Sequence, residues 1–378
     1  MIFKNLHPSF KERVHITPEL SNFLDMLRWI AALVVVVAHI RSTIMVPYSE
    51  LVSSNLFLDI FYFVSNIGHE AVIVFFVLSG FLVGGNTLDS FINNKFSWRI
   101  YLVNRVSRLY VVLVPALIIG FALDYFGSYL YEPYYMNEYG FGPFAYDVTT
   151  RVNFDTFVMN LLMMQTSHST QFGSNGPLWS LAYEFWYYIT FPLILGLIYN
   201  KKTLSRFFSA VILVLLLIVL NTNIFIYFAY WLIGIIVYLL YKNKCESYSH
   251  LYISLLIFIL LVYLSYINFF NVYKISLFFL AIATGYLIYS LQTSKILFSA
   301  FNVKMASFSY TLYLYHAPLL LYLASELGIT KSQPEWSSFA LFVFLLLCVY
   351  VYSYLAYLLF EKNTLNVRAF LHKVTSAK

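Results

Sequence analysis

Long runs of apolar residues, separated by short polar stretches, dominate this chain and indicate helices that cross a membrane. A helix needs about 20 mostly apolar residues to cross the hydrocarbon core of a bilayer, which is about 30 Å thick. Ten runs are long enough, near residues 24–45, 57–83, 100–123, 179–199, 206–221, 223–241, 250–268, 272–291, 307–325 and 337–360. We therefore predict an all-α polytopic membrane protein with a single integral-membrane domain over residues 1–378.

Composition supports this fold class. Hydrophobic residues make up 61% of the chain and the mean hydropathy is +0.75, which excludes an ordinary soluble globular protein. Only two cysteines occur, Cys245 and Cys348, so we expect neither a disulfide framework nor a cysteine-based metal site. The first twenty residues are charged and lack an apolar core segment, so we expect no signal peptide.

The distribution of basic residues predicts the orientation in the membrane. Eighteen of the 23 lysines and arginines fall on one side of the ten-span layout, in segments 1–23, 86–108, 200–206, 242–249, 292–306 and 361–378. Only Arg41, Arg151, Lys274 and Lys331 fall on the other side. Because cytoplasmic loops are enriched in lysine and arginine, both termini should lie in the cytoplasm. The net charge of +6 therefore does not indicate a nucleic-acid partner.

One long connection, residues 124–178, is external in this layout. It is rich in tyrosine and in acidic residues. Long ordered loops tend to be functional, and aromatic rings with hydroxyl groups suit a sugar-like partner. The alternative is an aromatic cap at the membrane interface that binds no ligand. Within the loop, residues 154–165 are too few to span and should lie in the interface or re-enter the membrane.

The first predicted span carries two ionisable residues, Arg28 and His39, with ten residues between them. Ionisable groups inside a spanning helix are costly and usually functional. A separation of eleven positions corresponds to about three helical turns, so the two side chains share one face, roughly 16 Å apart along the axis. We expect Arg28 near the cytoplasmic end and His39, a titratable base, in the outer half of the span.

Carboxylates at a similar depth could act with this histidine. Glu70 lies in the outer half of the second predicted span, and Trp179 and Glu184 open the fourth span from outside. A carboxylate can fix the tautomer of an imidazole and stabilise the imidazolium that proton transfer creates. Glu184 and Glu70 are both candidates for this role. The alternative for His39 is a core histidine bonded to a backbone carbonyl, and for His69 we favour such a structural role.

Three further polar groups could carry chemistry. Arg105 and Arg108, three positions apart, share a helix face and could clamp a phosphate. The alternative is simple anchoring at the cytoplasmic interface. His316, in the middle of a span, is a second base, a substrate contact or a structural group bonded to tyrosine, the last being slightly favoured. Glu361 closes the last span at the predicted cytoplasmic side, where a capping or loop-pairing role is favoured. Zinc-protease, G-x-S-x-G and Walker motifs are absent.

Taken together, five sequence blocks resemble the acyltransferase 3 family of bacterial integral-membrane enzymes. The blocks are Arg28 with His39, Phe75–Phe81 (FFVLSGF), Arg105 with Arg108, Leu178–Glu184 (LWSLAYE) and Ser309–His316 (SYTLYLYH). Their order matches the family and covers nearly the whole chain. Two features depart from it: Phe185-Trp186 follow Glu184, where Glu-Gln often stands, and there is no fused extracytoplasmic hydrolase-like domain.

The resemblance implies an O-acetyltransferase of the bacterial inner membrane. The donor would be cytoplasmic acetyl-CoA, with no metal, and the acceptor an external saccharide or lipid-linked glycan, such as O-antigen, capsule or exopolysaccharide. The residues assigned on this basis are His39, Arg28 and Glu184 for catalysis, Arg105, Arg108 and Ser79 for the donor, and Glu70, Trp179 and His316 for the acceptor. Membrane lipid is the expected surrounding partner, nucleic acid is not expected, and the oligomeric state stays open.

The mechanism and the class of protein leave alternatives open. His39 could act as a general base, or it could form a transient acetyl-imidazole before the sugar attacks. One rival function is a proton-coupled transporter or flippase for a lipid-linked saccharide, although no paired repeats with broken helices are evident. A second rival is a membrane-bound O-acyltransferase with His316 as its base. A non-enzymatic scaffold would leave the Arg28 and His39 spacing without a cause.

Overall fold

A computed structural model describes residues 16–242, 250–290 and 299–376 of the chain. Within these ranges the secondary structure is helical, and the β-type pairing consists of two isolated bridges, Met45 with Ser332 and Gln165 with Ser169. The predicted all-α class is confirmed. Cys245 and most of the N-terminal segment, on which two predictions rest, lie outside the described residues.

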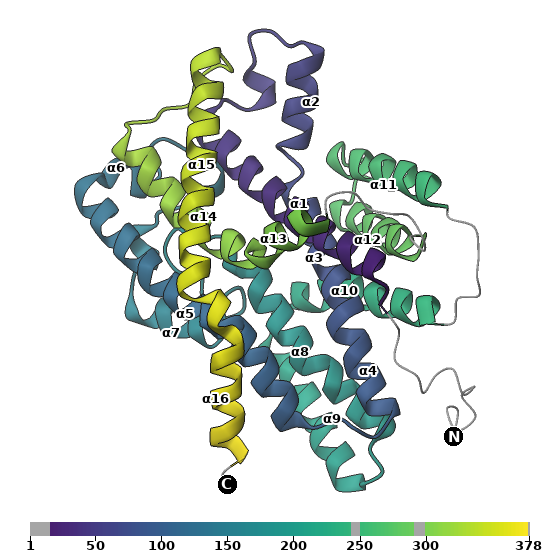
Figure 1. Ribbon diagram of the computed structural model, residues 1–378. Coiled ribbons are helices and arrows are strands. Elements are labelled where there is room, and N and C mark those ends of the chain that lie inside the picture. The colour runs from purple at the N-terminus through teal and green to yellow at the C-terminus, as the bar shows by residue number, and fades with distance from the viewer. Residues whose placement is uncertain (1–15, 243–249, 291–298, 377–378) are drawn as a thin grey trace. The chain divides into compact units, whose positions relative to one another are not determined.

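The helices follow one another with short connections, except between α5 and α8 (Figure 1). The α-helices are α1 (Pro18–Ile44), α2 (Leu56–Val64), α3 (Gly68–Ser79), α4 (Gly85–Ile92), α5 (Trp98–Leu130), α6 (Glu132–Tyr135), α7 (Phe154–Leu161), α8 (Leu178–Tyr199), α9 (Thr203–Val219), α10 (Thr222–Lys242), α11 (Leu251–Tyr266), α12 (Tyr273–Ser290), α13 (Ser299–Ser307), α14 (Ser309–Glu326), α15 (Trp336–Leu359) and α16 (Thr364–Ser376). Short 3-10 segments are η2 (Tyr48–Glu50), η4 (Gly142–Phe144), η5 (Thr149–Arg151) and η6 (Glu361–Asn363), and η3 (Gly80–Gly84) is a π-helix.

Seven helical segments in the described part of the chain are long and apolar enough to cross a membrane. They are Pro18–Ile44, Gly68–Ile92, Trp98–Leu130, Leu178–Tyr199, Thr222–Lys242, Tyr273–Ser290 and Trp336–Ser376. Three other predicted spans correspond to α9 and α11, which have 17 and 16 residues, and to α14, which is rich in polar side chains. A multi-pass membrane protein is therefore confirmed.

The second span differs in its bounds from the prediction of 57–83. The helix breaks after α2, and the segment long enough to cross the membrane is Gly68–Ile92. A guanidinium stabilises the break, because Arg41 donates to the Asn66 side chain at 2.8 Å and to the Ser65 carbonyl at 3.4 Å. The carbonyls at the end of a helix have no partner within the helix and need one elsewhere. Hydropathy alone cannot register this break.

The chain divides into two compact units, each built from separate stretches of sequence. The first unit comprises residues 1–28, 72–98 and 183–303. In it, α11 packs beside α12, and α10 contacts both η3 and α12 (Figure 1). Backbones come close where η3 meets α10, since a Cβ atom on Gly80 would lie 1.9 Å from the carbonyl oxygen of Trp231. Only glycine fits this contact.

The second unit comprises residues 29–71, 99–182 and 304–378. Its last two long helices, α14 and α15, lie side by side (Figure 1). The long loop after α5 is fastened by a buried carboxylate: Asp124 accepts from the Ser174 backbone at 2.8 Å and from its hydroxyl at 2.6 Å. Gly173 precedes this contact with φ +56°. The single domain over residues 1–378 stays a prediction.

Candidate active site

Two histidines meet in the second unit. His39 Nδ1 on α1 lies 2.8 Å from His316 Nε2 on α14, and the ring centroids are 5.0 Å apart. His316 is fully buried, with 0% of its surface exposed, whereas His39 is only half-buried. The more accessible ring therefore belongs to His39, and the ring behind it to His316.

The hydrogen bonds fix the tautomer of both rings. His316 Nδ1 lies 3.1 Å from the carbonyl oxygen of Leu312. A carbonyl can only accept, so Nδ1 of His316 carries the proton and its Nε2 offers a lone pair. His39 Nδ1–H then donates to that lone pair, which leaves the Nε2 of His39 unprotonated. In the neutral pair, Nε2 of His39 is the basic atom.

The surroundings of His316 join two of the sequence blocks. Ser180, at the start of α8, and Tyr313 on α14 share a hydrogen bond of 2.7 Å between their hydroxyls. The Tyr313 hydroxyl also lies within 3.2 Å of the Pro177 carbonyl, to which it can donate. Asn175 donates to the carbonyl of Leu314 at 2.9 Å. These contacts hold the helix turn that carries His316 against the start of α8.

A third histidine lies at the beginning of α3. The ring of His69 stacks on the indole of Trp179, with centroids 5.2 Å apart and planes 11° from parallel. The next residue, Glu70, is buried with 4% of its surface exposed. The structure thus brings Trp179 against the segment that carries Glu70, two residues that the sequence assigned to the acceptor.

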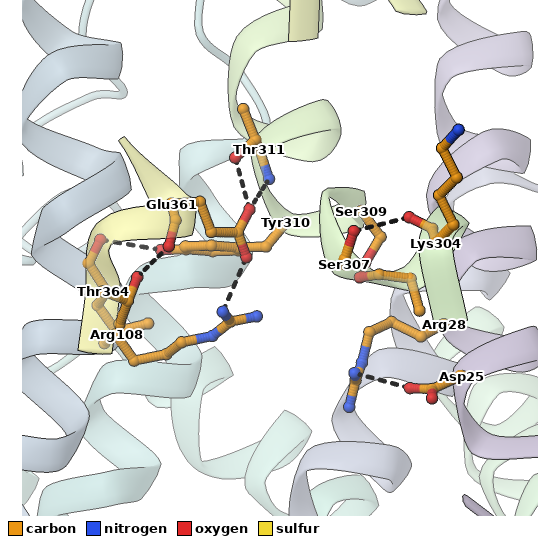
Figure 2. A network of polar contacts seen from close by, with 12 residues as sticks. Asp25, Arg28, Arg108, Lys304, Ser307, Ser309, Tyr310, Thr311, Glu361 and Thr364 are labelled. Atoms are coloured by element: carbon orange, nitrogen blue, oxygen red, sulfur yellow. Dashed lines mark hydrogen bonds and ion pairs between the residues drawn. The ribbon is translucent and has the colours of Figure 1, made fainter. Parts of the chain in front are cut away.

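Arginines at the start of α5 form the second polar centre of this unit (Figure 2). Arg108 makes an ion pair of 2.8 Å with Glu361, whose side chain is 1% exposed against 38% for the arginine. Glu361 also accepts from the Thr311 backbone at 3.2 Å and from its hydroxyl at 2.5 Å. Arg105 lies three residues before Arg108 on the same helix and is half-buried. The carboxylate therefore orients Arg108 while much of its guanidinium stays accessible.

The first unit holds a separate network of predicted residues. Glu184 on α8 accepts a short hydrogen bond from the Tyr188 hydroxyl, one turn later. That hydroxyl lies 3.1 Å from Ser79 Oγ, and Ser79 Oγ in turn accepts from the indole of Trp231 at 3.1 Å. A π-helix begins at the next residue, Gly80. Ser79 and Glu184 are therefore linked through one tyrosine.

Arg28 also belongs to the first unit and lies on the same helix as His39. Its Nη1 forms an ion pair with Asp25 at 3.3 Å, one turn earlier on α1 (Figure 2). The side chains are 30% and 22% exposed. A partly exposed ion pair of this kind contributes little to stability, so the guanidinium retains its capacity to bind an anion.

Comparison with known proteins connects this geometry to a family. The family model described as acyltransferase domain, acyltransferase 3, matches residues 21–358. The chain belongs to this family. Its described residues include several helices long and apolar enough to span a membrane. The resemblance drawn from the five sequence blocks is confirmed.

Two proteins show what this acyltransferase 3 family member is similar to in sequence. An O-acetyl transferase of Shigella phage Sf6 is 28% identical over 190 residues, which is 48% of this chain and 48% of the phage protein. An uncharacterized protein of Haemophilus influenzae is 30% identical over 154 residues, 40% of this chain and 58% of that protein. The chain thus spans about half the length of these relatives. No solved structure matches it at a significant level.

Sequence reasoning on this acyltransferase found the residues but not all of their partners. It offered Glu184 or Glu70 as the partner of His39, whereas the structure gives His39 a hydrogen bond to His316. It gave Glu361 a capping or loop-pairing role. In the structure Glu361 accepts from the Thr311 backbone at the start of α14, and it also forms an ion pair with Arg108 that the sequence did not indicate. The signal in the sequence was weak. His316 and Glu361 are ionisable groups in or at the end of a predicted span, but nothing in the sequence indicates which residue each of them contacts.

The segment 124–178, predicted to be external, presents some of its aromatic rings and buries others. Tyr129 is 82% exposed and Tyr139 is 42% exposed, whereas Tyr135 is fully buried. Tyr134 packs on Tyr139, with centroids 4.4 Å apart. Sugar binding by this loop stays a prediction. Among the residues that the structure describes, no three acidic, histidine or cysteine side chains gather as metal ligands.

Proposed function

We propose that this acyltransferase moves an acetyl group from cytoplasmic acetyl-CoA to a hydroxyl of a cell-surface saccharide or lipid-linked sugar. O-antigen, capsule and exopolysaccharide are the expected acceptors. The single observation that carries the proposal is the pair of His39 and His316, in a chain of the acyltransferase 3 family. The printed function of the phage relative, O-acetyl transfer, supports the choice of acetyl group and of oxygen as acceptor.

His39 is the proposed general base. Its Nε2 would take the proton of the acceptor hydroxyl as the hydroxyl oxygen attacks the thioester carbonyl. A C–O bond forms, the C–S bond breaks, and the proton passes from His39 to the departing thiolate of CoA. Such acid–base assistance accelerates a reaction typically by about 10²–10⁴-fold. The half-exposed ring is consistent with a group that touches substrate.

His316 is the proposed positioning residue for this base. Its burial and its bond to the Leu312 carbonyl favour this role over direct contact with the acceptor. When His39 gains a proton on Nε2, its Nδ1–H still donates to His316, so the bond persists through the reaction. The same burial disfavours the rival in which His316 itself takes the proton from the acceptor.

The donor would bind at the start of α5. Arg105 and Arg108 offer guanidinium groups that match the geometry of phosphate oxygens. The ion pair with Glu361 supports this role, because it holds one edge of Arg108 and leaves the other accessible. CoA carries its phosphates at the end remote from the thioester, so a site at the predicted cytoplasmic end of α5 would leave the acetyl group free to reach inward.

Roles for residues of the first unit rest on the sequence blocks. Arg28 would assist catalysis by binding negative charge, and its exposed pair with Asp25 is compatible with that role. Ser79 would contact the donor, and Glu184 would act as a catalytic carboxylate. The Tyr188 hydroxyl between Ser79 and Glu184 supports a shared function for these two side chains.

We also propose ten membrane crossings, with both termini in the cytoplasm, in the bacterial inner membrane. Helices at all ten predicted places support the count. Three of these helices are too short or too polar to be identified as membrane-spanning by length and hydropathy alone. The lysine and arginine bias supports the orientation. The loop after α5 would then face the acceptor.

The proposal is tested with purified protein in lipid nanodiscs. Acetyl-CoA with a radiolabelled acetyl group and a saccharide extract from a deletion strain are supplied, and label in the saccharide and free CoA thiol are measured. We expect saccharide label and free CoA thiol to appear in equal amounts, both with the wild type and with His250→Ala, a variant of an exposed control histidine. His39→Ala should be at least about 100-fold slower.

Two outcomes would contradict the proposal. A wild-type rate in His39→Ala would remove this histidine from the chemistry. Saccharide movement across the membrane without release of thiol would instead establish the proton-coupled transporter, for which two hydrogen-bonded imidazoles could serve as a relay. These results are separable because one concerns a variant and the other the wild type.

A further inference from the structure

The C-terminal helix α16 docks along the first part of α5, in the second unit. Four polar contacts join the two helices. Arg368 Nε donates to Ser107 Oγ at 3.3 Å, and His372 Nε2 lies 3.2 Å from Asn104 Oδ1. Arg99 donates to the Thr375 carbonyl and the Ser376 hydroxyl at 2.9 Å each. These contacts repeat along both helices at intervals of three to five residues. Polar side chains therefore hold helix α16, most of which is exposed, against α5.

The docking brings a third arginine to the pair on α5. Asn104 and Ser107, which contact α16, alternate along the helix with Arg105 and Arg108, so the contact face and the arginine face adjoin. Arg368 meets α5 at Ser107, which lies between Arg105 and Arg108 in the sequence. All three arginines are half-buried.

Three guanidinium groups give this cluster a positive character. Glu361 pairs with Arg108, whose side chain stays 38% exposed. Like charges held close together repel one another unless an anion neutralises them. Because Nε of Arg368 is directed to Ser107, the two terminal nitrogens of its guanidinium are the ones available to an anion. The arrangement suits a planar, bidentate contact with phosphate.

We propose that Arg368 completes, with Arg105 and Arg108, a three-arginine site for the phosphate groups of a nucleotide-type acyl donor. This inference rests on the proposed function, in which the donor is acetyl-CoA. CoA carries a diphosphate and a separate phosphate on its ribose, so more than two guanidinium groups can be engaged at once. Helix α16 then belongs to the donor site, and Arg368 is a residue that no sequence block includes.

Binding of CoA to the purified protein tests the proposal. The protein is held in a zwitterionic detergent, and affinities are measured by calorimetry for CoA and for dephospho-CoA. Arg368→Gln should weaken CoA binding by about 10- to 100-fold, the range for loss of a hydrogen-bonded charge. The loss of turnover in this variant should be smaller with acetyl-pantetheine, a donor without phosphates, than with acetyl-CoA.

Matched variants separate this effect from loss of fold or of general charge. Lys373→Gln removes an exposed cation from the same helix and should bind CoA as the wild type does. Ser107→Ala removes the bond to Arg368 without changing any charge and should weaken CoA binding by only a few-fold. If Arg368→Gln does not fold, Arg368→Lys retains the charge without the planar fork and should still bind CoA more weakly than the wild type.

The outcomes are distinct. Unchanged CoA affinity in a folded Arg368 variant, while the wild type binds, would overturn this inference alone. Equal weakening by Lys373→Gln would also overturn it, because a diffuse charge would then explain the effect. A loss of CoA affinity in the Arg368 variant that appears only in vesicles containing phosphatidylglycerol, and not in vesicles of phosphatidylcholine, would assign the site to a lipid headgroup instead. Failure of the wild type to bind CoA at all would refute the proposed function as well.

Discussion

Substitution of Glu361 by glutamine tests whether a buried carboxylate positions the donor-binding arginine. Glutamine keeps the shape and one accepting oxygen, so the contacts from Thr311 can persist. It removes the negative charge that lies 2.8 Å from Nη1 of Arg108. The side chain of Glu361 is 1% exposed, so water cannot replace the lost interaction from its side.

The structure sets the size of the expected effect. Two unit charges at this separation attract each other by about 6 kcal/mol at an effective dielectric constant of about 20. Because 38% of the Arg108 side chain is exposed, solvent screens much of this energy. Desolvation of the carboxylate offsets a further part. We therefore expect a net coupling of about 1–2 kcal/mol, with CoA affinity reduced about 10-fold as Arg108 loses its orientation.

A double-mutant cycle measures this coupling. Arg108→Ala, Glu361→Gln and the double variant are compared with the wild type by unfolding in detergent and by CoA titration. We expect the losses in both measurements to be clearly less than additive. Thr311→Val serves as the control, since it removes only the hydroxyl contact to Glu361. Additivity within about 0.5 kcal/mol, or lost stability with unchanged CoA affinity, would refute the reasoning.

Three further substitutions test the packing and the histidine pair. Gly80→Ala forces a Cβ atom to within 1.9 Å of the Trp231 carbonyl, so we expect a loss of about 1–3 kcal/mol and a lower melting temperature; unchanged melting would contradict the close contact. Asp124→Asn weakens the buried contact to Ser174 by about 1–3 kcal/mol, which limited proteolysis of the external loop should detect as faster cleavage. His316→Ala should lower kcat by about 100-fold with little change in the KM for acetyl-CoA, and a wild-type kcat would exclude its positioning role.

The sequence predicts the spans well because hydrophobic length is a local property. The helices at the predicted places confirm this, but the break between α2 and α3 depends on a distant contact. Arg41 on α1 stabilises the buried C-terminal end of α2, and no periodicity within 57–83 reveals that. Hydropathy merges the two helices because the intervening residues are few and the flanking residues apolar.

The candidate site shows the same limit. His39 and Arg108 stand out locally, as ionisable groups in or beside a span. Their partners, His316 and Glu361, can also be identified as ionisable groups, but which residues pair cannot. The two histidines, for example, are separated by 277 positions in sequence. A carboxylate is a common partner of a basic histidine, so sequence reasoning considered carboxylates, and a backbone carbonyl as the alternative, but not a second histidine. Which helices pack together decides the partner, and that is a tertiary property.

Mass spectrometry of the surface saccharides in vivo tests the central claim most directly. A strain lacking this chain is complemented with the wild type, His39→Ala or the control His250→Ala, and the glycans are compared. O-acetylation by the His39 pair predicts that one saccharide gains the mass of an acetyl group with the wild type and the control, and lacks it with His39→Ala. An acetylated saccharide in the His39→Ala strain, or no difference between the wild type and the deletion, would contradict it.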